Sequence, residues 1–231
     1  MNIFLSSGKH IPHTFQQFIH KLPTLDNHYG PWLAGGSVRK LWQGLPWWSG
    51  DVDVFFSSRE QYESWSNHFR NLPRPDIDLE HLRAHMVRDW QEDWFSTEKP
   101  IAKPKGDILR VHERMVSDNA ESLVLSGACR QLNEIKLQLV HKWFPKDLQQ
   151  LFDHFDITVC QFATTGTGIW CTSQAAQHCE ERKLHFHDWA RSHSPTMRVL
   201  KYMMYGFEPT AQTLLQCADL IVAGDVACDQ Y

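Results

Sequence analysis

The chain of 231 residues lacks any long apolar run. Nothing in it approaches the 18 or so apolar residues that a membrane-spanning helix needs, and near the amino terminus only residues 3–5 are consecutively apolar. We therefore expect a soluble, unprocessed, cytoplasmic protein. An excess of positive charge is also lacking, because 23 Lys and Arg stand against 27 Asp and Glu and give a formal net charge of −4. Any affinity for nucleic acid must therefore come from a local basic patch.

The six cysteines include no CxxC pair and have no regular spacing. This argues against a zinc ribbon and a disulfide framework, so we expect reduced thiols. Internal repeats and low-complexity tracts are absent as well. A group of metal-ligating residue types at His178, Cys179, His185, His187 and His193 fits no familiar tetrahedral spacing. Solvated or capping histidines are the preferred interpretation there, and a zinc site is the alternative.

Aromatic residues are abundant, with ten tryptophans, several of them in pairs or near turns such as Trp47 and Trp48. Two interpretations are open, a stacking surface for a ligand and a set of large, partly buried side chains, of which we favour the second. Lys99, Lys103 and Lys105, with Arg110 and Arg114 further on, form the densest basic stretch. It either guides a polyanionic acceptor or is a solvated loop.

Periodicity and turn signals predict alternating helices and strands. Helices are expected at residues 13–22, 37–43 and 59–71, after Pro145, from 172 or 173 to about 185, and from Ser194-Pro195 onward. Strands are expected at residues 32–34, 51–56, 108–111, 135–140 and 157–162. The predicted fold class is α/β in the α+β sense, a mixed sheet backed by helices. We assign residues 1–190 to one domain with an insertion at about 72–106, and residues 191–231 to a helical appendage.

A strand, a glycine turn and a helix precede two closely spaced carboxylates. Gly35 and Gly36 offer unobstructed backbone N–H groups at the start of a helix, where a triphosphate binds readily. In the next strand, period two places Asp51 and Asp53 on one face. Like charges at the mouth of an apolar strand favour a cation, and Mg²⁺ is usually held by one or two carboxylates plus substrate phosphates.

A second Asp-x-Asp triplet serves as a comparison. Asp76 and Asp78 follow Pro75 and precede a helical pattern, far from the glycines. Helix-start charge is the preferred interpretation of that copy.

These motifs resemble the signature of the DNA polymerase β-like nucleotidyltransferase superfamily, and most closely the head of bacterial CCA-adding enzymes and poly(A) polymerases. The residues that carry the resemblance are Gly35-Gly36-Ser37-Val38-Arg39, Gly44-Leu45-Pro46 and Asp51-Val52-Asp53. The segment 156–163 is similar to that family's strand with a third carboxylate, at Asp156, Thr158 and Ala163. The segment 194–207 is similar to the helix after the nucleotide pocket, at Pro195, Arg198, Leu200 and Phe207.

The resemblance implies a metal-dependent, template-independent nucleotidyltransferase. Asp51, Asp53 and Asp156 would bind Mg²⁺ or Mn²⁺, and capping of its own strand is the alternative role for Asp156. A nucleoside triphosphate, ATP included, would be held by Gly35, Gly36 and Ser37, with Arg39, Arg198 and Lys201 as further phosphate contacts. The favoured acceptor is the hydroxyl of an RNA 3′ end, with a protein side chain or a small molecule as alternatives. Pyrophosphate would be released.

Two departures from the family motivate another class of function. The family has an acidic residue where this chain has Lys40, and a basic pair where it has His154-Phe155. A binding module that keeps the fold and a nucleotide or RNA surface without turnover is therefore the alternative. Trp47-Trp48 form a small insertion before the carboxylates, and no region matches a tRNA-gripping body, so we do not expect a CCA-adding role.

Overall fold

The computed structural model describes residues 2–6, 11–72, 108–129, 131–188 and 194–222. The predicted insertion at 72–106, with Asp76, Asp78, Lys99, Lys103 and Lys105, lies outside the described residues except for residue 72. Within the described ranges, none of the helices combines the length and the hydropathy that crossing a lipid bilayer requires.

An eight-stranded mixed sheet organises the molecule, with the strand order β1-β8-β7-β2-β3-β6-β5-β4. Its strands are β1 (Ile3–Ser6), β2 (Trp32–Ala34), β3 (Asp51–Phe55), β4 (Arg110–Val116), β5 (Ala120–Ser126), β6 (Ile135–Val140), β7 (Phe162–Thr164) and β8 (Ile169–Thr172). All neighbouring strands run antiparallel except β3 and β6, which are parallel with Asp51 opposite Lys136 and Phe55 opposite Val140. A separate two-stranded ribbon pairs β9 (Lys183–Leu184) with β10 (Glu208–Pro209). The expected mixed sheet is confirmed.

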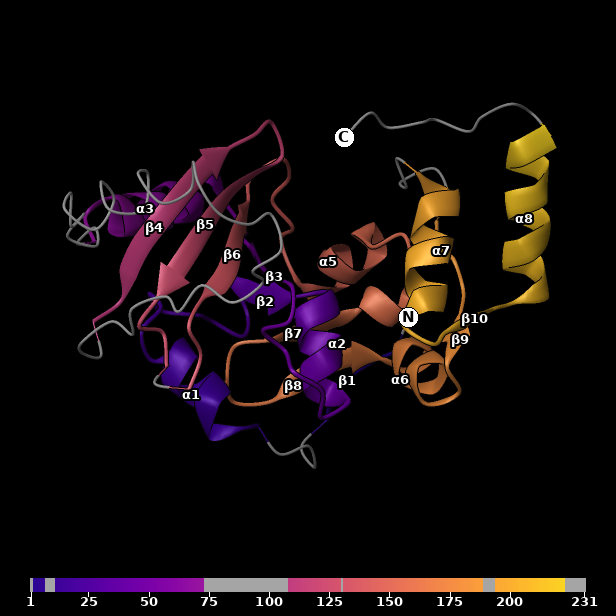
Figure 1. Ribbon diagram of the computed structural model, residues 1–231, viewed down its shortest axis with the longest axis horizontal. Helices are drawn as coiled ribbons and strands as arrows, with labels where there is room; N and C mark the ends of the chain where they lie inside the picture. The colour runs from indigo at the N-terminus through magenta and orange to yellow at the C-terminus, as the bar shows by residue number, and fades with distance from the viewer. Residues whose placement is uncertain (1, 7–10, 73–107, 130, 189–193, 223–231) are drawn as a thin grey trace, which may run out of the picture.

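Helices pack against this sheet and against the two-stranded ribbon (Figure 1). They are α1 (His13–Ile19), α2 (Gly36–Trp42), α3 (Arg59–Arg70), α5 (Leu148–His154), α6 (Ser173–Glu180), α7 (Pro195–Met204) and α8 (Ala211–Val222), with a short 3₁₀ helix η1 (Thr158–Cys160). In Figure 1 the hairpin of β4 and β5 lies toward one end of the molecule, beside α3, and α7 and α8 lie toward the other. The boundary near residue 190 stays a prediction.

The core forms where strand periodicity meets the inner faces of the helices. In β6, Ile135, Leu137 and Leu139 are buried on alternate positions, as the sequence pattern predicts. Trp47 is fully buried against Phe15 and Phe18 of α1, with ring centroids 4.9 and 5.2 Å away. For Trp47, the structure therefore confirms the interpretation as a large buried side chain rather than as part of an exposed stacking surface.

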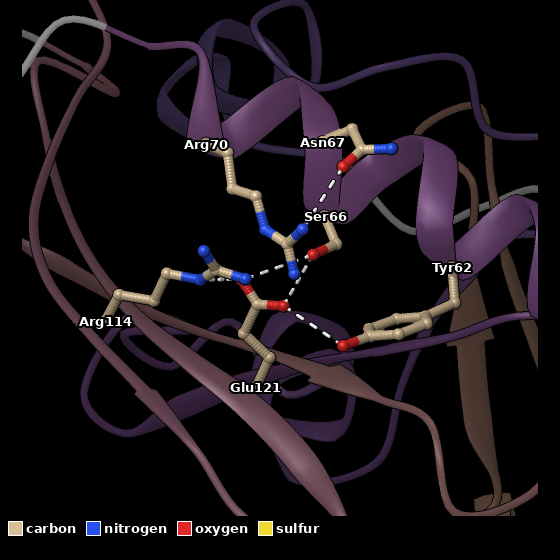
Figure 2. A network of polar contacts seen from close by, with 6 residues as sticks. All are labelled: Tyr62, Ser66, Asn67, Arg70, Arg114 and Glu121. Carbon is tan, nitrogen blue, oxygen red and sulfur yellow. Dashed lines mark hydrogen bonds and ion pairs between the residues drawn. The ribbon is translucent and has the colours of Figure 1, made fainter.

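A buried carboxylate fastens α3 to the hairpin of β4 and β5 (Figure 2). Glu121 of β5 is fully buried and accepts hydrogen bonds from Tyr62 Oη at 3.1 Å and Ser66 Oγ at 2.8 Å. Its other oxygen lies 2.5 Å from Nε of Arg114 on β4. Arg114, predicted to be part of a basic patch or a solvated loop, is therefore committed to an ion pair within the fold.

Several predicted boundaries are wrong. The strand expected at 108–111 is β4, which begins at Arg110 and continues to Val116. The helix expected to open at Pro145 begins at Leu148, because Asp147 is its N-cap and accepts a hydrogen bond from the backbone N–H of Gln150. The helix expected to reach about residue 185 ends at Glu180, although its predicted cap Thr172 is correct. Strands β1, β5 and β8 were not predicted.

Candidate active site

The paired carboxylates lie where the period-two pattern predicts, on one face of β3. Val52 and Val54 are fully buried on the opposite face, while Asp51 is exposed and Asp53 half-buried. Burial, and then the charge of Asp51, raise the pKa of Asp53 from 3.8 to about 7. In the part of the chain that the structure describes, no side chain donates a hydrogen bond to either carboxylate or forms an ion pair with it. Two neighbouring carboxylates whose charges are not compensated by hydrogen bonds or ion pairs favour the binding of a cation.

The glycine turn approaches this pair closely. Gly35 has φ of 85° and ψ of −143°, a conformation that side-chain-bearing residues rarely adopt. A Cβ at Gly35 would lie 3.5 Å from Oδ2 of Asp53, and at Gly36 the same position is open, with nothing within 4 Å. The next residue, Ser37, is buried, and its Oγ has no hydrogen-bond partner. An unpartnered buried hydroxyl beside open backbone is a feature that a phosphate oxygen would satisfy.

Arg39 is a buried cation on α2. Only 2% of it is exposed, and its guanidinium lies over the rings of Phe207, Tyr202 and Tyr205 at 5.0, 5.1 and 5.7 Å. Its Nε and Nη1 atoms have no hydrogen-bond partner. The aromatic side chains therefore stabilise the charge and join α2 to α7 and the residues directly after it, while the donors on Nε and Nη1 are left unsatisfied.

The third predicted carboxylate is held by an arginine. Nη2 of Arg198, on α7, donates a hydrogen bond of 2.8 Å to Oδ1 of Asp156, and its Nε lies 2.5 Å from Oδ2. Next to this pair, Sγ of Cys160 and Oη of Tyr202 share a hydrogen bond of 2.8 Å. Burial raises the pKa of both Cys160 and Tyr202, so both remain protonated at neutral pH. These contacts dock α7 against η1.

The strand predicted at residues 157–162 is wrong. Asp156 precedes the 3₁₀ helix η1, and the strand β7 begins only at Phe162. Every residue from 157 to 162 is buried, so the burial pattern holds no period that separates a strand from a helical turn. Gln161 ties this turn to its neighbours, since its Nε2 donates to the carbonyl of Phe152 at 3.0 Å and its Oε1 accepts from Thr172 at 2.9 Å.

Lys40, one of the two departures from the family pattern, ties down the loop before the carboxylates. Its Nζ donates to the carbonyl of Ser49 at 2.9 Å and to the Oγ of the same residue at 3.0 Å. Burial, followed by the charge of Arg39, lowers the pKa of Lys40, while the charge of Asp51 acts in the opposite direction. Lys40 therefore joins α2 to the start of β3.

All predicted site residues line one cavity of about 890 Å³. They are Gly35, Gly36, Ser37, Arg39, Asp51, Asp53, Asp156, Arg198 and Lys201. A second cavity, of about 690 Å³, is lined by other residues, among them Asn2, Gln149 and His187. The structure thus brings together residues of four motifs that extend from Gly35 to Lys201 in the sequence, although their roles stay predictions.

Sequence reasoning missed an aromatic and polar set in the same cavity. Its members include Phe55, Asn119, Lys142, Trp143, Tyr202 and Tyr205. The departure at His154-Phe155 was the available signal, because both residues line the cavity. Trp143 gave no signal of its own, because it lies between a predicted strand and Pro145 and belongs to no motif.

The residues present fit a divalent cation as a two-carboxylate site. In the ranges that the structure describes, no group of three or more His, Cys, Asp or Glu side chains is arranged to hold a metal ion. Asp51 and Asp53 nevertheless supply hard oxygen donors that no described side chain occupies, and Mg²⁺ takes its remaining ligands from water and substrate phosphates. Among the histidines weighed for zinc, the Nδ1 of His178 shares a hydrogen bond of 2.8 Å with Oγ1 of Thr158.

Known structures resemble this fold. The Bacillus stearothermophilus CCA-adding enzyme in complex with CTP aligns with a TM-score of 0.52 and 17% identity over 90% of this chain and 45% of its own. The Thermotoga maritima CCA-adding enzyme complexed with tRNA gives 0.50 and 13% over 92% and 44%. Another CCA-adding enzyme with CTP gives 0.53 and 13% over 97% and 46%. At these identities the likeness establishes the fold, and the chain spans less than half the length of those enzymes.

Comparison at the level of sequence adds a family. No protein of curated function matches the sequence significantly. A family model does match residues 9–182, which is more than half of the chain and includes the glycine turn and all three carboxylates. The chain therefore belongs to the Gabija anti-defense 2 family, and it has the fold of the CCA-adding enzyme head.

Proposed function

We propose that this protein is a metal-dependent, template-independent nucleotidyltransferase that moves a nucleoside monophosphate from a nucleoside triphosphate onto a hydroxyl. The favoured acceptor is an RNA 3′ end. One observation carries the proposal: two neighbouring carboxylates, without a hydrogen-bond or ion-pair partner among the described residues, share a cavity with a glycine turn and with Arg39, Arg198 and Lys201. The likeness to CCA-adding enzymes solved with CTP and with tRNA supports a triphosphate and an RNA as partners.

In the proposed reaction, the acceptor oxygen forms a bond to the α-phosphorus. The bond from that phosphorus to the oxygen bridging the β-phosphate breaks, and pyrophosphate leaves with the electron pair. The hydroxyl proton passes to solvent. A divalent cation held by Asp51 and Asp53 would lower the pKa of the acceptor hydroxyl and neutralise charge on the α-phosphate. No protein nucleophile is needed in this scheme.

The chain's own residues bind and orient the triphosphate. The open space beside Gly36 and the unpartnered hydroxyl of Ser37 support a position for the β- and γ-phosphates, whose oxygens would accept hydrogen bonds from the backbone N–H groups of Gly36 and Ser37. Arg39 offers unsatisfied N–H donors from its aromatic surroundings. Lys201 acts at longer range, because its charge lowers the pKa of Asp53. Together these groups would hold the leaving pyrophosphate at one end of the cavity.

Asp156 keeps its proposed role as the third metal-binding carboxylate on one condition. Its carboxylate is neutralised by Arg198 in this structure, so it would bind the metal only when Arg198 turns to a substrate phosphate. The pairing supports a coupled role, in which one arginine exchanges a carboxylate for a phosphate oxygen. The alternative is that Asp156 serves to position Arg198.

The family description bears on the biological process in which the proposed transfer would act. A family described as Gabija anti-defense supports the proposal that the modified acceptor is one whose change counters Gabija. A catalytically silent binding module is the alternative function, favoured by the pairing of Asp156 and by Lys40 in place of an acidic residue. That module would bind a nucleotide or RNA and release no pyrophosphate.

The test compares the wild type with the Asp51→Asn, Asp53→Asn double variant. Label transfer and pyrophosphate release are measured from each of the four NTPs with Mg²⁺ or Mn²⁺, against total RNA and total protein. We expect label in RNA and a loss of at least about 1,000-fold in the double variant, since both carboxylates contact the reacting centre. The matched control is Asp76→Asn, Asp78→Asn, the same change in the other Asp-x-Asp triplet, which should transfer like the wild type.

A second arm uses cells that carry Gabija. The wild type and the control variant should counter the defence, and the Asp51, Asp53 variant should not. Metal-dependent NTP binding without pyrophosphate release would overturn turnover in favour of the binding module. Absence of both activity and binding would overturn the proposed site itself.

A further inference from the structure

The cavity has an aromatic end that the proposed transfer does not use. The rings of Trp143 and His154 are stacked with centroids 3.9 Å apart and only 13° between their planes. Trp143 is half-buried and His154 exposed, and both line the cavity. We call these two residues the aromatic shelf. Parallel rings presented to a cavity form a flat apolar surface that suits another planar ring.

The shelf lies beyond the carboxylates along the same strand face. Asp51, Asp53 and Phe55 are alternate residues of β3 and all line the cavity, so the face runs from charged to aromatic. At its far end Phe55 pairs in register with Val140, the last residue of β6, and Trp143 follows three residues later. The cations lie toward the other end, since the charge of Asp51 acts on Lys40 and that of Lys201 on both Lys40 and Asp53.

Two elements hold the shelf in place. The backbone carbonyl of Asn119, at the turn between β4 and β5, accepts the N–H groups of His141 at 3.0 Å and Lys142 at 3.1 Å. This fixes the segment that leads into Trp143. From the other side, His154 is the last residue of α5, and its neighbour Phe155 packs edge-on against Phe55 at 5.6 Å. The shelf is thus set by the fold before any ligand arrives.

In-line transfer places the acceptor opposite the leaving group. If pyrophosphate leaves toward the cations of α2 and α7, the attacking hydroxyl must come from the end of the strand face where Phe55 and the shelf lie. Lys142, exposed and lining the cavity beside Trp143, adds a positive charge there. A basic side chain next to exposed aromatic rings is the arrangement with which proteins bind single-stranded nucleic acid.

We propose that the aromatic shelf of Trp143 and His154 stacks a nucleobase of a single-stranded RNA acceptor, with Lys142 contacting its backbone phosphate. The inference rests on the proposed nucleotidyl transfer for the direction of attack, and it names the part of the chain that selects the acceptor. The same chemistry, a nucleobase, also exists in the incoming triphosphate. The experiment therefore measures binding of the two sources separately.

The experiment uses the full chain and two probes, a fluorescently labelled single-stranded RNA 12-mer of mixed sequence and a fluorescent ATP analogue with Mg²⁺. Trp143→Leu and His154→Ala should each weaken RNA binding about tenfold, within the range for one stacked base, and change the affinity for the ATP analogue less than about twofold. Lys142→Ala should weaken RNA binding and reduce its salt dependence. His154 is exposed, so its variant is expected to fold even if Trp143→Leu does not.

Matched controls are Trp48→Leu, a half-buried tryptophan outside the cavity lining, and Lys146→Ala, an exposed lysine four residues after Lys142. Both should bind RNA like the wild type. Loss of affinity for the ATP analogue with RNA binding unchanged would overturn the proposal and assign the shelf to the base of the triphosphate. Unchanged binding of both probes would overturn it too. Shelf-dependent RNA binding without binding of the ATP analogue would support the shelf while contradicting the proposed transfer.

Discussion

Glu121 and Asp53 are carboxylates of the same sheet in opposite circumstances. Glu121 is fully buried on β5, where Tyr62 and Ser66 donate hydrogen bonds to it and Arg114 supplies the opposite charge (Figure 2). Asp53, half-buried on β3, has another carboxylate beside it and a pKa raised to about 7. One negative charge is compensated by the fold itself, and the other is not.

The difference separates a charge that joins elements of the fold from one for which we propose a ligand. Burying a carboxylate is costly unless donors and an opposite charge compensate it. The polar contacts of Glu121 come from α3 and β4, so its charge serves to join elements. The partners of Asp53 are expected from outside the chain, as a cation and the phosphates it carries. Each of the following predictions would break or sharpen this comparison.

Glu121→Ala should cause the largest loss of stability. We expect the free energy of unfolding to fall by about 3 kcal/mol, because two hydroxyls and a guanidinium lose a buried partner at once. Urea denaturation monitored by circular dichroism measures it. Glu113→Ala, an exposed glutamate on the neighbouring strand β4, is the control and should stay within about 0.5 kcal/mol of the wild type. A loss below about 1 kcal/mol at Glu121 would show that the network does not fasten α3.

Asp53→Asn should act in the opposite direction on the metal-free protein. Because the pKa of Asp53 is raised from 3.8 to about 7, the folded state binds this proton more tightly than the unfolded state. This contribution to stability is therefore largest below about pH 4 and is lost as the pH rises toward 7. The variant should gain about 1–2 kcal/mol at pH 8 in a chelator, an estimate reduced for solvent screening of a half-buried group.

The check is urea denaturation at pH 4.5 and pH 8, with and without Mg²⁺. Added Mg²⁺ should stabilise the wild type at pH 8 and leave Asp53→Asn unchanged, since a ligand stabilises only the state that binds it. Asp118→Asn, an exposed aspartate in the turn between β4 and β5, should show neither effect. An Asp53→Asn protein less stable than the wild type at pH 8 would mean that the fold does compensate this carboxylate.

The placement of Asp51 and Asp53 in this comparison was predictable from sequence because it is local. A period-two strand fixes the shared face of Asp51 and Asp53, and two consecutive glycines mark the turn that approaches them. The burial of Glu121 was not. In β5, the alternate buried positions are Glu121, Leu123 and Leu125. Because the first of them is charged, the sequence lacks the alternation of apolar and polar residues that predicts a strand. Only the donors on α3 and β4 make that burial possible.

The aromatic shelf could not be predicted from the sequence, for a related reason. Trp143 and His154 are separated by a loop and a helix, and they stack only because α5 packs beside the end of β6. The strand expected at 157–162 failed where every residue is buried, because burial without period fits a strand and a helical turn equally. Local patterns predicted several of the elements and the shared face of Asp51 and Asp53, whereas contacts between distant segments determined the rest.

Of these variants, Tyr62→Phe should lower the free energy of unfolding least, and it isolates the contribution of a single hydrogen bond. The ring of Tyr62 packs against Phe56 and His141, with centroids 5.7 and 4.8 Å away, and phenylalanine keeps both contacts. Only the hydrogen bond to Glu121 is lost, so we expect about 1 kcal/mol of destabilisation in urea denaturation. Burial, and then the charge of Glu121, raise the pKa of Tyr62, so it remains a donor and the loss should be constant between pH 5 and about 9.

The loss should vanish when Glu121 is already alanine, and Tyr29→Phe, at a residue that is 72% exposed, should be neutral. No measurable loss would mean that Tyr62 stabilises the fold by packing alone and that the charge of Glu121 is compensated by Ser66 and Arg114, whereas a pH-dependent loss, or one that persists without Glu121, would mean that the Tyr62 hydroxyl acts through another group.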